Sequence, residues 1–329
     1  MLVAVKKPFT VKIDQDNGQL SWRCHVLSVK QFKRRDLDEE IFPEAENMLT
    51  MVTMVGKVGY LSGKVIALLF YQPSTRTMMS FWTASERLGG STNAINYVQF
   101  SSVSKGESLP DTIRTVGGYC NAIVMRHPEV GSAKIAADYS PVPIINAGDG
   151  TGEHPTQALL DLFTIRRELG HLDDLTVTMV GDLANGRTVH SLARLLTLYK
   201  GIRLNFISPS SLRMPANMLA ELRGQGVVPE EYDHLDKTVV AQSDVLYVTR
   251  VQREYMTDAE KSMDNPFVVT PETMSWAKPR GSMILMHPLP RVGEITLEVD
   301  EDPRAAYFRQ SEYGMYMRMA LLKLILRRE

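Results

Sequence analysis

Short apolar runs rich in β-branched residues alternate along the chain with longer segments of helical periodicity. Such runs are typical of buried strands in parallel sheets, and the segments between them are typical of covering helices. The predicted strands are Val65–Phe70, Ala122–Met125, Val142–Ile145, Thr176–Val180, Leu204–Ile207, Val245–Val248 and Met283–Leu285. The predicted helices are Phe42–Val55, Met78–Leu88, Leu109–Tyr119, Thr156–Leu169, Val189–Tyr199, Met214–Gln225, Pro271–Trp276 and Tyr313–Leu326. This alternation predicts an α/β protein with doubly wound parallel sheets and helices on both faces.

The length of 329 residues favours two domains, because a single core rarely grows past ~250–300 residues. The glycine-containing segment Asn146–Gly152 predicts a loop before a long helix, and we expect the domain boundary near it. The last helix is apolar on much of its surface and is expected to pack back on the first domain. The expected divisions are residues 1–23, 24–154, 155–308 and 309–329. Within the first of these, weak alternation in Phe9–Arg23 around Asp16-Asn17-Gly18 predicts a hairpin.

Composition and charge exclude several classes of function. The chain is 44% hydrophobic and 23% charged, as in soluble globular proteins, and its net charge of −1 attracts neither nucleic acid nor an anionic membrane. The basic residues of Lys30–Arg35 run straight into the acidic ones of Asp36–Glu40, which is typical of a solvated helix face. No apolar run approaches the ~18 residues of a membrane span, and Met1–Ala4 is too short for a signal peptide, so we expect a cytoplasmic protein.

The two cysteines, Cys24 and Cys120, are too few for a disulfide framework or a zinc site. They are expected to be small buried residues or free thiols in a reducing compartment. The sequence therefore offers no metal-binding cluster of cysteines.

A group of hydroxyl and cationic residues, Ser74-Thr75-Arg76-Thr77, follows the predicted strand Val65–Phe70. The next segment is helical, so these residues stand at its first turn, where free backbone N–H groups and the positive end of the helix dipole converge. Hydroxyls and a guanidinium at that point suit a dianionic phosphate. Ordinary N-capping would explain Ser74 or Thr75, but it does not require Arg76.

Two further candidate segments end strands in the first half, where open α/β sheets bind ligands. Arg126 follows directly on the strand Ala122–Met125. His154 and Gln157 lie three residues apart at the start of a helix, and together they suit an uncharged carbonyl and NH₂ group. A surface arginine, a capping histidine and a solvated glutamine are the structural alternatives.

The segment Gly181–Thr188 nearly matches the phosphate-binding loop G-x-x-x-x-G-K-[ST], with Arg187 in place of the lysine. No convincing Mg²⁺-binding aspartate ends another apolar strand, so a nucleotide site is the weaker interpretation. An arginine at this helix start can instead hold a carboxylate in bidentate fashion.

Two later loops, Thr249–Gln252 and His287–Arg291, each follow a hydrophobic strand. Prolines in the second loop stiffen it and leave carbonyls that can accept hydrogen bonds from an ammonium or amide. Arg250 in the first loop adds a cation, although a solvated turn explains that loop equally well. With Arg76, Arg126 and Arg187 also at strand ends, the pattern suits small, multiply anionic substrates. No residue has the sequence context of an activated nucleophile.

Taken together, these segments resemble the aspartate/ornithine carbamoyltransferase family. The matching pieces are Pro73–Thr77, Ser104–Ser108, His154–Asp161, Gly181–Thr188, Arg250–Gln252 and His287–Arg291. The resemblance runs from about Cys24 to Leu326. Ornithine enzymes typically carry His-Cys-Leu-Pro and Ser-Met-Gly motifs, whereas this chain has Pro288 and Arg250-Val251-Gln252 there. The aspartate branch is therefore implied, since two arginines suit two carboxylates and would repel the cation of ornithine.

The resemblance implies transfer of the carbamoyl group of carbamoyl phosphate to the α-amine of L-aspartate, in pyrimidine biosynthesis, without a metal or organic cofactor. Residues 24–154 would bind carbamoyl phosphate and residues 155–308 aspartate. The phosphate would be held by Ser74, Thr75, Arg76 and Thr77. The carbonyl oxygen would contact Thr77, Arg126 and His154. The carbamoyl NH₂ would bind Gln157 and the carbonyls of Pro288 and Leu289. Aspartate would be held by Lys105, Arg187, Arg250 and Gln252.

Lys105, with Ser101 or Ser102, lies on a loop that in this family reaches into a neighbouring subunit's site. The resemblance therefore implies a homotrimer with shared active sites, in which Ser101 contacts carbamoyl phosphate and Lys105 is catalytic. Val103-Ser104 departs from the common pattern, which leaves the exact serine open. A higher assembly with regulatory chains is also left open, and neither nucleic acid nor membrane is an expected partner.

Three alternatives remain at this point. The acceptor amino acid could differ from aspartate, as in relatives that use modified ornithines. A regulatory module could bind nucleotides at Gly181–Thr188. A catalytically silent subunit could retain the fold, although such a chain is expected to lose arginine or histidine at several of these points, and here none is missing.

Overall fold

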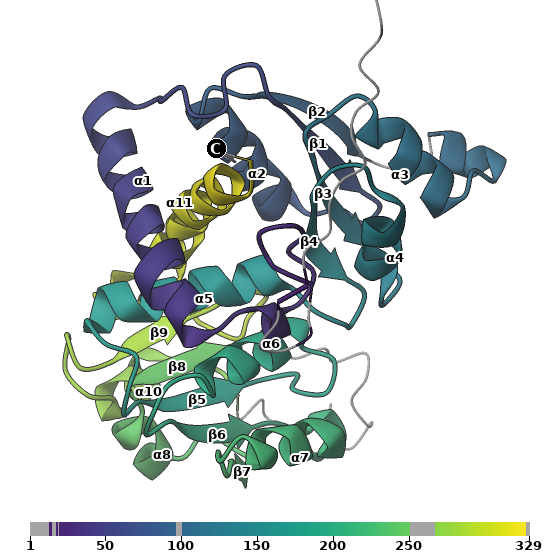
Figure 1. Cartoon of the computed structure of the whole chain (residues 1–329). Coiled ribbons are helices and arrows are strands. Elements are labelled where there is room, and N and C mark those ends of the chain that lie inside the picture. Colours follow the sequence, from purple (N-terminus) through teal and green to yellow (C-terminus); the bar gives the residue numbers. More distant parts are fainter. Residues whose placement is uncertain (1–12, 15–17, 19, 97–100, 251–266, 327–329) are drawn as a thin grey trace, which may run out of the picture. The chain divides into compact units, whose positions relative to one another are not determined.

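A computed structural model describes residues 13–14, 18, 20–96, 101–250 and 267–326 (Figure 1). The chain forms two compact units. Unit 1 comprises Met1–Thr156 and Met315–Glu329, and unit 2 comprises Gln157–Gly314. The division falls in the first turn of helix α5 (Pro155–Leu169) and within helix α11 (Tyr307–Leu326).

Unit 1 contains a four-stranded parallel sheet in the order β2-β1-β3-β4. Its strands are β1 (Val65–Phe70), β2 (Ser91–Asn96), β3 (Ala122–His127) and β4 (Ile144–Asp149). The chain passes from β1 to a neighbour on one side and then crosses to β3 on the other. The sheet is therefore doubly wound, with its topological switch point between β1 and β3.

Helices cover both faces of this sheet (Figure 1). They are α2 (Thr75–Arg87), α3 (Leu109–Gly117) and α4 (Ser132–Tyr139), whereas α1 (Phe42–Val55) lies beside α11. On one face, alternate residues such as Leu69 and Ile123 pack in a buried cluster with Ile113 of α3 and Ala136 of α4. Helix α2 lies against β1 and β2 on the other face. Because β1 and β3 bury side chains on both faces of the sheet, these two strands are largely continuous apolar runs.

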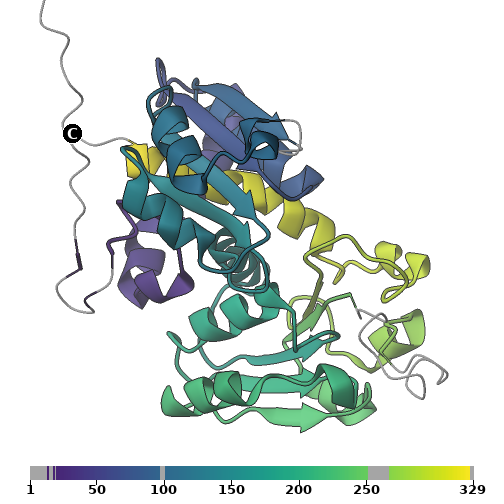
Figure 2. The same cartoon turned by 90° about the vertical axis from the view of Figure 1, so that its right-hand side faces the viewer.

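The C-terminal part of α11 packs on unit 1, as predicted, and lies beside α2 in both views (Figure 2). Arg318, only 3% exposed, donates from Nη1 to Ser80 Oγ at 2.6 Å, and its guanidinium lies 5.1 Å from the ring centre of Phe81. Lys323 Nζ donates to Glu44 Oε1 of α1 at 2.6 Å. Buried cations with directed partners therefore fix this helix in one position.

Unit 2 contains a five-stranded parallel sheet in the order β7-β6-β5-β8-β9. Its strands are β5 (Thr176–Val180), β6 (Arg203–Ile207), β7 (Glu230–Tyr232), β8 (Val245–Val248) and β9 (Ile284–Met286). This sheet is also doubly wound, and its switch point lies between β5 and β8.

Helices cover both faces of the second sheet as well. They are α5, α6 (Arg187–Leu196), α7 (Ala216–Gly224), α8 (Lys237–Gln242) and α10 (Pro271–Trp276). One face buries Val180 and Leu246 with Val239 of α8 and Met274 of α10. On the other face, Tyr247 of β8 donates to a carboxylate on α5. The predicted class, two doubly wound α/β domains with a returning C-terminal helix, is confirmed.

The differences from the predicted elements have physical reasons. Strands β2 and β7 lie at sheet edges and carry polar sequences, so neither has an apolar run to reveal it. Helices α4 and α8 are short and were also missed. Helix α2 begins at Thr75 rather than Met78, because the residues chosen as candidate ligands form its first turn. Helix α11 begins at Tyr307 rather than Tyr313, and the added turns mix aromatic and polar residues without an apolar period.

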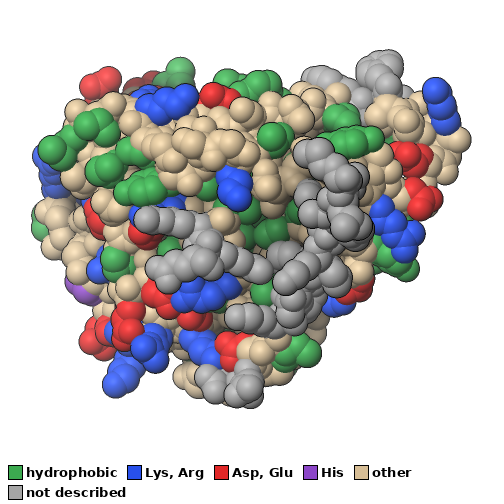
Figure 3. Space-filling view, turned by 45° about the horizontal axis from the view of Figure 1, so that its top comes forward, with side chains coloured by type: hydrophobic (Ala, Val, Ile, Leu, Met, Phe, Trp, Pro, Cys, Tyr) green, Lys and Arg blue, Asp and Glu red, His purple; other side chains and the backbone are tan. Residues whose placement is uncertain are grey.

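Other predictions concern the N-terminal region and the surface. Ile13 and Leu20 form an antiparallel bridge, consistent with the predicted hairpin, whose residues 15–17 lie outside the described part. The basic–acidic segment is a solvated helix with ion pairs Arg34–Asp38 and Arg35–Glu39. On the face drawn in Figure 3, cationic and acidic side chains are interspersed. None of the described helices is long and apolar enough to cross a membrane.

Candidate active site

The carboxyl end of the first sheet brings together residues from two parts of the sequence. Phe70, the last residue of β1, pairs in register with Arg126 of β3, and the chain then enters α2. The segment Ser74–Thr77 and Arg126 therefore both lie at this edge, beside the switch point. Ligands bind at this position in open α/β sheets.

The start of α2 offers uncommitted polar groups. Ser74 is the N-cap residue, with φ −160° and ψ 93°, yet its hydroxyl forms no capping hydrogen bond. The side chains of Ser74, Thr75 and Arg76 make no hydrogen bond or ion pair with the part of the chain that the structure describes. Partial desolvation lowers the pKa of Arg76, but a guanidinium remains charged. A cation and two hydroxyls thus stand at the positive end of a 13-residue helix.

Arg126 and His154 are held more closely. Arg126 donates from Nη1 to the carbonyl of Ala147 in β4 at 3.2 Å, so its guanidinium spans the ends of two strands. His154, 4% exposed, follows a tightly turned loop. In that loop Gly150 has φ +53°, and a Cβ there would lie 2.4 Å from the carbonyl oxygen of Pro128, so only glycine fits.

The residue before His154 fixes the end of this loop. Glu153 accepts from Ser28 Oγ at 2.6 Å and from Val29 N–H at 2.7 Å, and its own N–H donates to Asp149 Oδ1 at 2.8 Å. These contacts set the entry of the chain into α5. The orientation of His154 is thereby determined by residues that sequence periodicity does not reveal.

Lys105 ends a short 3₁₀ helix (Ser102–Lys105), which Ser101 caps by accepting from Val103 N–H at 3.3 Å. The side chain of Lys105 is exposed and has no hydrogen bond or ion pair within the described residues of this chain. Residues 97–100, which precede this turn, lie outside the described part.

In unit 2, the loops after β5 and β8 contact each other at the switch point. Gly181 has φ +123°, and a Cβ there would lie 2.4 Å from the carbonyl oxygen of Thr249, so the two loops approach as backbone against backbone. Arg187 is half-buried at the start of α6, and Arg250 is exposed directly after Thr249. Gln252 lies outside the described residues.

The same loop argues against a nucleotide site. Asp182, 2% exposed, accepts from Asn185 N–H at 2.9 Å and also contacts the Asn185 side chain. A phosphate-binding loop needs its N–H groups free for the ligand. A buried carboxylate that already occupies the loop would instead repel a phosphate.

The loop after β9 is fixed in a specific conformation. Leu289 has φ +55°, a region that non-glycine residues seldom adopt and that recurs at functional sites. Its N–H donates to Nδ1 of His287 at 2.8 Å, and Nε2 of His287 contacts Glu294 Oε1 at 2.9 Å. Burial acts to raise the pKa of Glu294, but hydrogen bonds from His287 and the Val292 N–H outweigh it and lower that pKa.

One buried carboxylate joins several of these elements. Asp161, fully buried on α5, accepts from Nε2 of Gln157 at 2.9 Å and from Nε2 of Gln310 at 2.7 Å. Its other oxygen accepts from the Tyr247 hydroxyl at 2.8 Å. Asp161 ends the motif His154–Asp161, but the motif alone indicates no role for it. The signal was present, because Gln157 and Asp161 lie four residues apart and so share a helix face.

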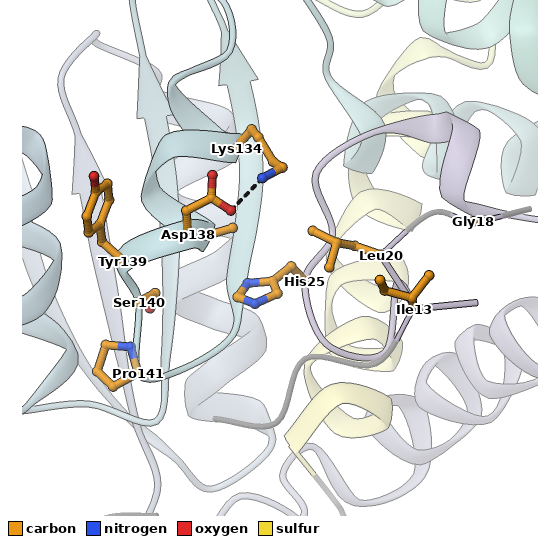
Figure 4. Close-up of a pocket in the computed structure, with 10 residues that line it drawn as sticks. Ile13, Gly18, Leu20, His25, Lys134, Asp138, Tyr139, Ser140 and Pro141 are labelled. Atoms are coloured by element: carbon orange, nitrogen blue, oxygen red, sulfur yellow. Dashed lines mark hydrogen bonds and ion pairs between the residues drawn. The ribbon is translucent and has the colours of Figure 1, made fainter. Parts of the chain in front are cut away.

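A cavity of about 540 Å³ lies elsewhere in unit 1 (Figure 4). Ser140 and Pro141, on its wall, precede β4, so it belongs to the amino end of the sheet. Lys134 and Asp138, also on the wall, form an ion pair with each other. Its charges are therefore satisfied, and it lacks the candidate residues. Among the described residues no cluster of His, Cys, Asp and Glu could hold a metal ion.

Ligands of open α/β sheets bind at switch points, and arginines near both switch points of this chain suit small anionic ligands. Residues 24–167 match the carbamoyl-P binding domain of aspartate/ornithine carbamoyltransferases, and residues 173–325 match their Asp/Orn binding domain. The chain belongs to the aspartate/ornithine carbamoyltransferase family.

Individual relatives agree with this assignment. The chain is 51% identical to the aspartate carbamoyltransferase catalytic subunit of Methanothrix thermoacetophila, over 92% of this chain and 98% of that one. It is 52% identical to the multifunctional protein pyr1-3 of Dictyostelium discoideum, of whose length it spans 13%. A crystal structure of Trypanosoma cruzi aspartate transcarbamoylase with carbamoyl phosphate and aspartate matches with a TM-score of 0.86 and 41% identity, covering 92% and 97% of the two chains.

Proposed function

We propose that this protein transfers the carbamoyl group of carbamoyl phosphate to the α-amine of L-aspartate, giving N-carbamoyl-L-aspartate and phosphate in pyrimidine biosynthesis. The main supporting observation is the start of α2, where Ser74, Thr75 and Arg76 are uncommitted at the carboxyl edge of the first sheet. The names of the relatives support the same reaction.

In the proposed mechanism, the nitrogen of the α-amine attacks the carbamoyl carbon and forms the new C–N bond. Negative charge develops on the carbonyl oxygen, where Thr77, Arg126 and His154 would donate. One such donor contributes ~2.7–4 kcal/mol to transition-state stabilisation. The C–O bond to phosphate then breaks, and the departing phosphate accepts the proton lost by the amine. No step requires a metal or an organic cofactor.

The groups that hold carbamoyl phosphate follow from its parts. The phosphate is assigned to the start of α2, together with Ser101 and Lys105. The NH₂ group needs acceptors, which are assigned to Gln157 and the carbonyls of Pro288 and Leu289. Within the described chain, neither of these two carbonyls accepts a hydrogen bond. They are thus available to a ligand.

Aspartate is assigned to Arg187, Arg250 and Gln252, with Lys105. Guanidinium groups match carboxylates in charge and geometry. Their like charge would disfavour the ammonium of ornithine. The test is phosphate release from carbamoyl phosphate with a panel of amino acids. Turnover with aspartate and not with ornithine is expected, and preference for another acceptor would refute the assignment.

We further propose a homotrimer in which Lys105 serves the site of a neighbouring subunit. Lys105 is exposed and unengaged within its own described chain, which supports this role. Large apolar side chains are also exposed on α2 and β2: Met79 is 54%, Trp82 37% and Ile95 38% exposed. An apolar surface of this kind suits a second copy of the chain.

Mixing inactive variants tests the shared site. Chains carrying Arg76→Ala and chains carrying Lys105→Ala are each expected to be inactive as pure oligomers. A mixed trimer contains one site of three with neither substitution, so about a third of native activity per mixed trimer should return. Mixed oligomers of trimeric mass that remain inactive would refute the proposal.

We also assign the protein to the cytoplasm. Cys24 and Cys120 are both buried and form no disulfide, which suits a reducing compartment. Fractionation of the producing cells, followed by the activity assay, tests this assignment.

A further inference from the structure

The three groups assigned to the carbamoyl NH₂ share one buried anchor within unit 2. Gln157 contacts Asp161 directly. Pro288 and Leu289 belong to a loop that reaches Asp161 through Gln310, whose Oε1 accepts from His287 N–H at 3.0 Å. The carboxylate of Asp161 therefore supports all three groups that are proposed to accept hydrogen bonds from the carbamoyl NH₂.

The direction of each hydrogen bond follows from chemistry. A carboxylate has acceptors only, so the end of Gln157 that faces Asp161 must be its Nε2 amide. The Oε1 end of the same group is then turned away from Asp161. Without this contact, the two ends of the amide could exchange places by rotation. Asp161 thus determines that Gln157 presents an acceptor rather than a donor.

The amide of Gln310 is oriented by Asp161 in the same way. Its Nε2 faces Asp161 at 2.7 Å, so its Oε1 accepts from the backbone of His287. Nδ1 of His287 accepts from Leu289 N–H, so the ring proton is on Nε2 and is donated to Glu294. Each donor in this series is matched to an acceptor. The backbone N–H of Leu289 is thereby turned inward, which fixes the peptide plane that carries the carbonyl of Pro288, directly before the carbonyl of Leu289.

Tyr247 completes the anchor. Burial, and then the charge of Asp161, raise the pKa of Tyr247 well above its ordinary value. Its hydroxyl therefore stays protonated and donates to the second carboxylate oxygen at 2.8 Å. With donors on both oxygens, the Asp161 carboxylate cannot rotate freely.

We infer that Asp161 is a positioning residue that makes the NH₂ subsite an acceptor-only site and thereby selects carbamoyl phosphate over acetyl phosphate. This inference rests on the proposed function. The two molecules differ only in NH₂ against CH₃. A methyl group cannot donate, so it leaves oriented acceptors unpaired, and sites built around a hydrogen bond reject such analogues strongly.

The test uses the full chain and two constants. These are the KM for carbamoyl phosphate and the competitive inhibition constant of acetyl phosphate. Asp161→Leu has nearly the same shape but no acceptor, so Gln157 and Gln310 lose their orientation. The KM is expected to rise about tenfold, the effect of one lost hydrogen bond, while the inhibition constant changes by less than about twofold. Equal changes in both constants, or no change in either, would overturn the inference.

Two further variants separate positioning from structural damage. Asp161→Asn keeps one oxygen for both glutamines, and its Nδ2 can donate to Tyr247, so it should retain most of the selectivity. Loss as large as with leucine would refute the orientation argument. Asp244→Asn is the matched control. Asp244 accepts from Thr176 N–H at 2.7 Å, at the amino edge of the sheet of unit 2. This substitution should leave the ratio of the two constants unchanged.

A double-variant cycle shows whether Asp161 acts through Gln157. Gln157→Met removes the acceptor itself and should raise the KM for carbamoyl phosphate. In the Asp161→Leu background the same substitution should add less than about threefold, because the acceptor is already misdirected. Independent, multiplicative effects would contradict the inference.

The outcomes distinguish failure of the proposed function from failure of the inference about Asp161. If the unmodified chain forms no carbamoyl aspartate, the proposed function fails. If it is active but the selectivity ratio is unaffected by Asp161→Leu, only the inference fails. If circular dichroism shows that Asp161→Leu is unfolded, Asp161→Ser replaces it. Its hydroxyl is too short to accept from both glutamines, so the same loss of selectivity is expected.

Discussion

At the start of α2 in unit 1, the side chains of Ser74, Thr75 and Arg76 make no hydrogen bond within the described chain. In unit 2, by contrast, Gln157 and the His287–Leu289 loop are held by a series of directed hydrogen bonds. The first region is assigned to a dianion and the second to a neutral amide. Coulomb attraction acts over several ångströms and tolerates imperfect geometry, whereas telling NH₂ from CH₃ depends on where each donor and acceptor points.

The two regions therefore need their side chains oriented to different degrees before the ligand binds. A charged side chain can remain hydrated until its ligand arrives and still contribute to binding. An amide that is free to rotate presents a donor as readily as an acceptor and therefore discriminates poorly.

The largest effect is expected in unit 1. Arg76→Ala should lower kcat about a thousandfold with the fold intact, because it removes a donor from the developing charge on phosphate. Arg76→Lys keeps the charge but not the planar set of guanidinium donors, so its loss of kcat should be clearly smaller. Steady-state kinetics and circular dichroism are the measurements, with Arg114→Ala on the exposed surface of α3 as control. Equal losses for Ala and Lys would contradict the idea that charge outweighs geometry here.

Arg250→Ala should raise the KM for aspartate about ten- to hundredfold while leaving the KM for carbamoyl phosphate within about threefold. The reason is that a charge-assisted hydrogen bond to one substrate is lost and the other substrate does not depend on it. Kinetics with each substrate varied in turn provide the measurement. A parallel rise in both constants would show that Arg250 supports the fold or both ligands.

Glu294→Gln tests the support beneath the oriented loop. Because the folded pKa of Glu294 lies below its ordinary value of 4.5, its stabilising effect is present above that pH and is lost as the pH falls through the lowered pKa. The substitution should therefore lower unfolding free energy by about 1–2 kcal/mol at pH 7, and the difference should vanish well below pH 4. Urea unfolding is the measurement, and exposed Glu301→Gln is the control. A constant difference at all pH values would exclude the linkage.

The smallest effect is expected from Leu289→Gly. Glycine removes the strain of a positive φ but gains freedom when unfolded, so stability should change by less than about 1 kcal/mol. The carbonyls of Pro288 and Leu289 would be less firmly oriented, which should lower kcat/KM for carbamoyl phosphate about two- to threefold. Asp174→Gly, at φ +58° in the same unit, is the control and should leave kinetics unchanged. An increase in kcat/KM with Leu289→Gly would argue against a benefit of orientation.

Sequence patterns predicted some elements fully and others not at all. Val65–Phe70, Thr176–Val180 and Val245–Val248 have the predicted bounds, because strands buried on both faces must be continuous apolar runs. The edge strands β2 and β7 escaped detection because partial exposure allows polar residues. The fold class was accessible because it depends mainly on the alternation of these elements.

The candidate site divides in a similar way. Arg76, Arg126 and Arg187 stand at strand ends or helix starts that the sequence could predict. The role inferred for Asp161 was not accessible, because it depends on contacts with Gln310 and Tyr247, which lie far away in sequence. Periodicity indicates which face of a helix a residue occupies, but not which partner it meets there.

The path of α11 has a consequence for synthesis on the ribosome. Unit 2 is one contiguous stretch, complete at Gly314, whereas unit 1 also requires Met315 onward. The hydroxyl of Ser80 and the carboxylate of Glu44 receive Arg318 and Lys323 only when this last segment emerges. The later half of the chain can thus finish folding first. Until then the apolar side chains of this segment, among them Met317, Met319 and Leu321, are not in their buried places, and apolar surface exposed in this way makes a nascent chain prone to aggregation.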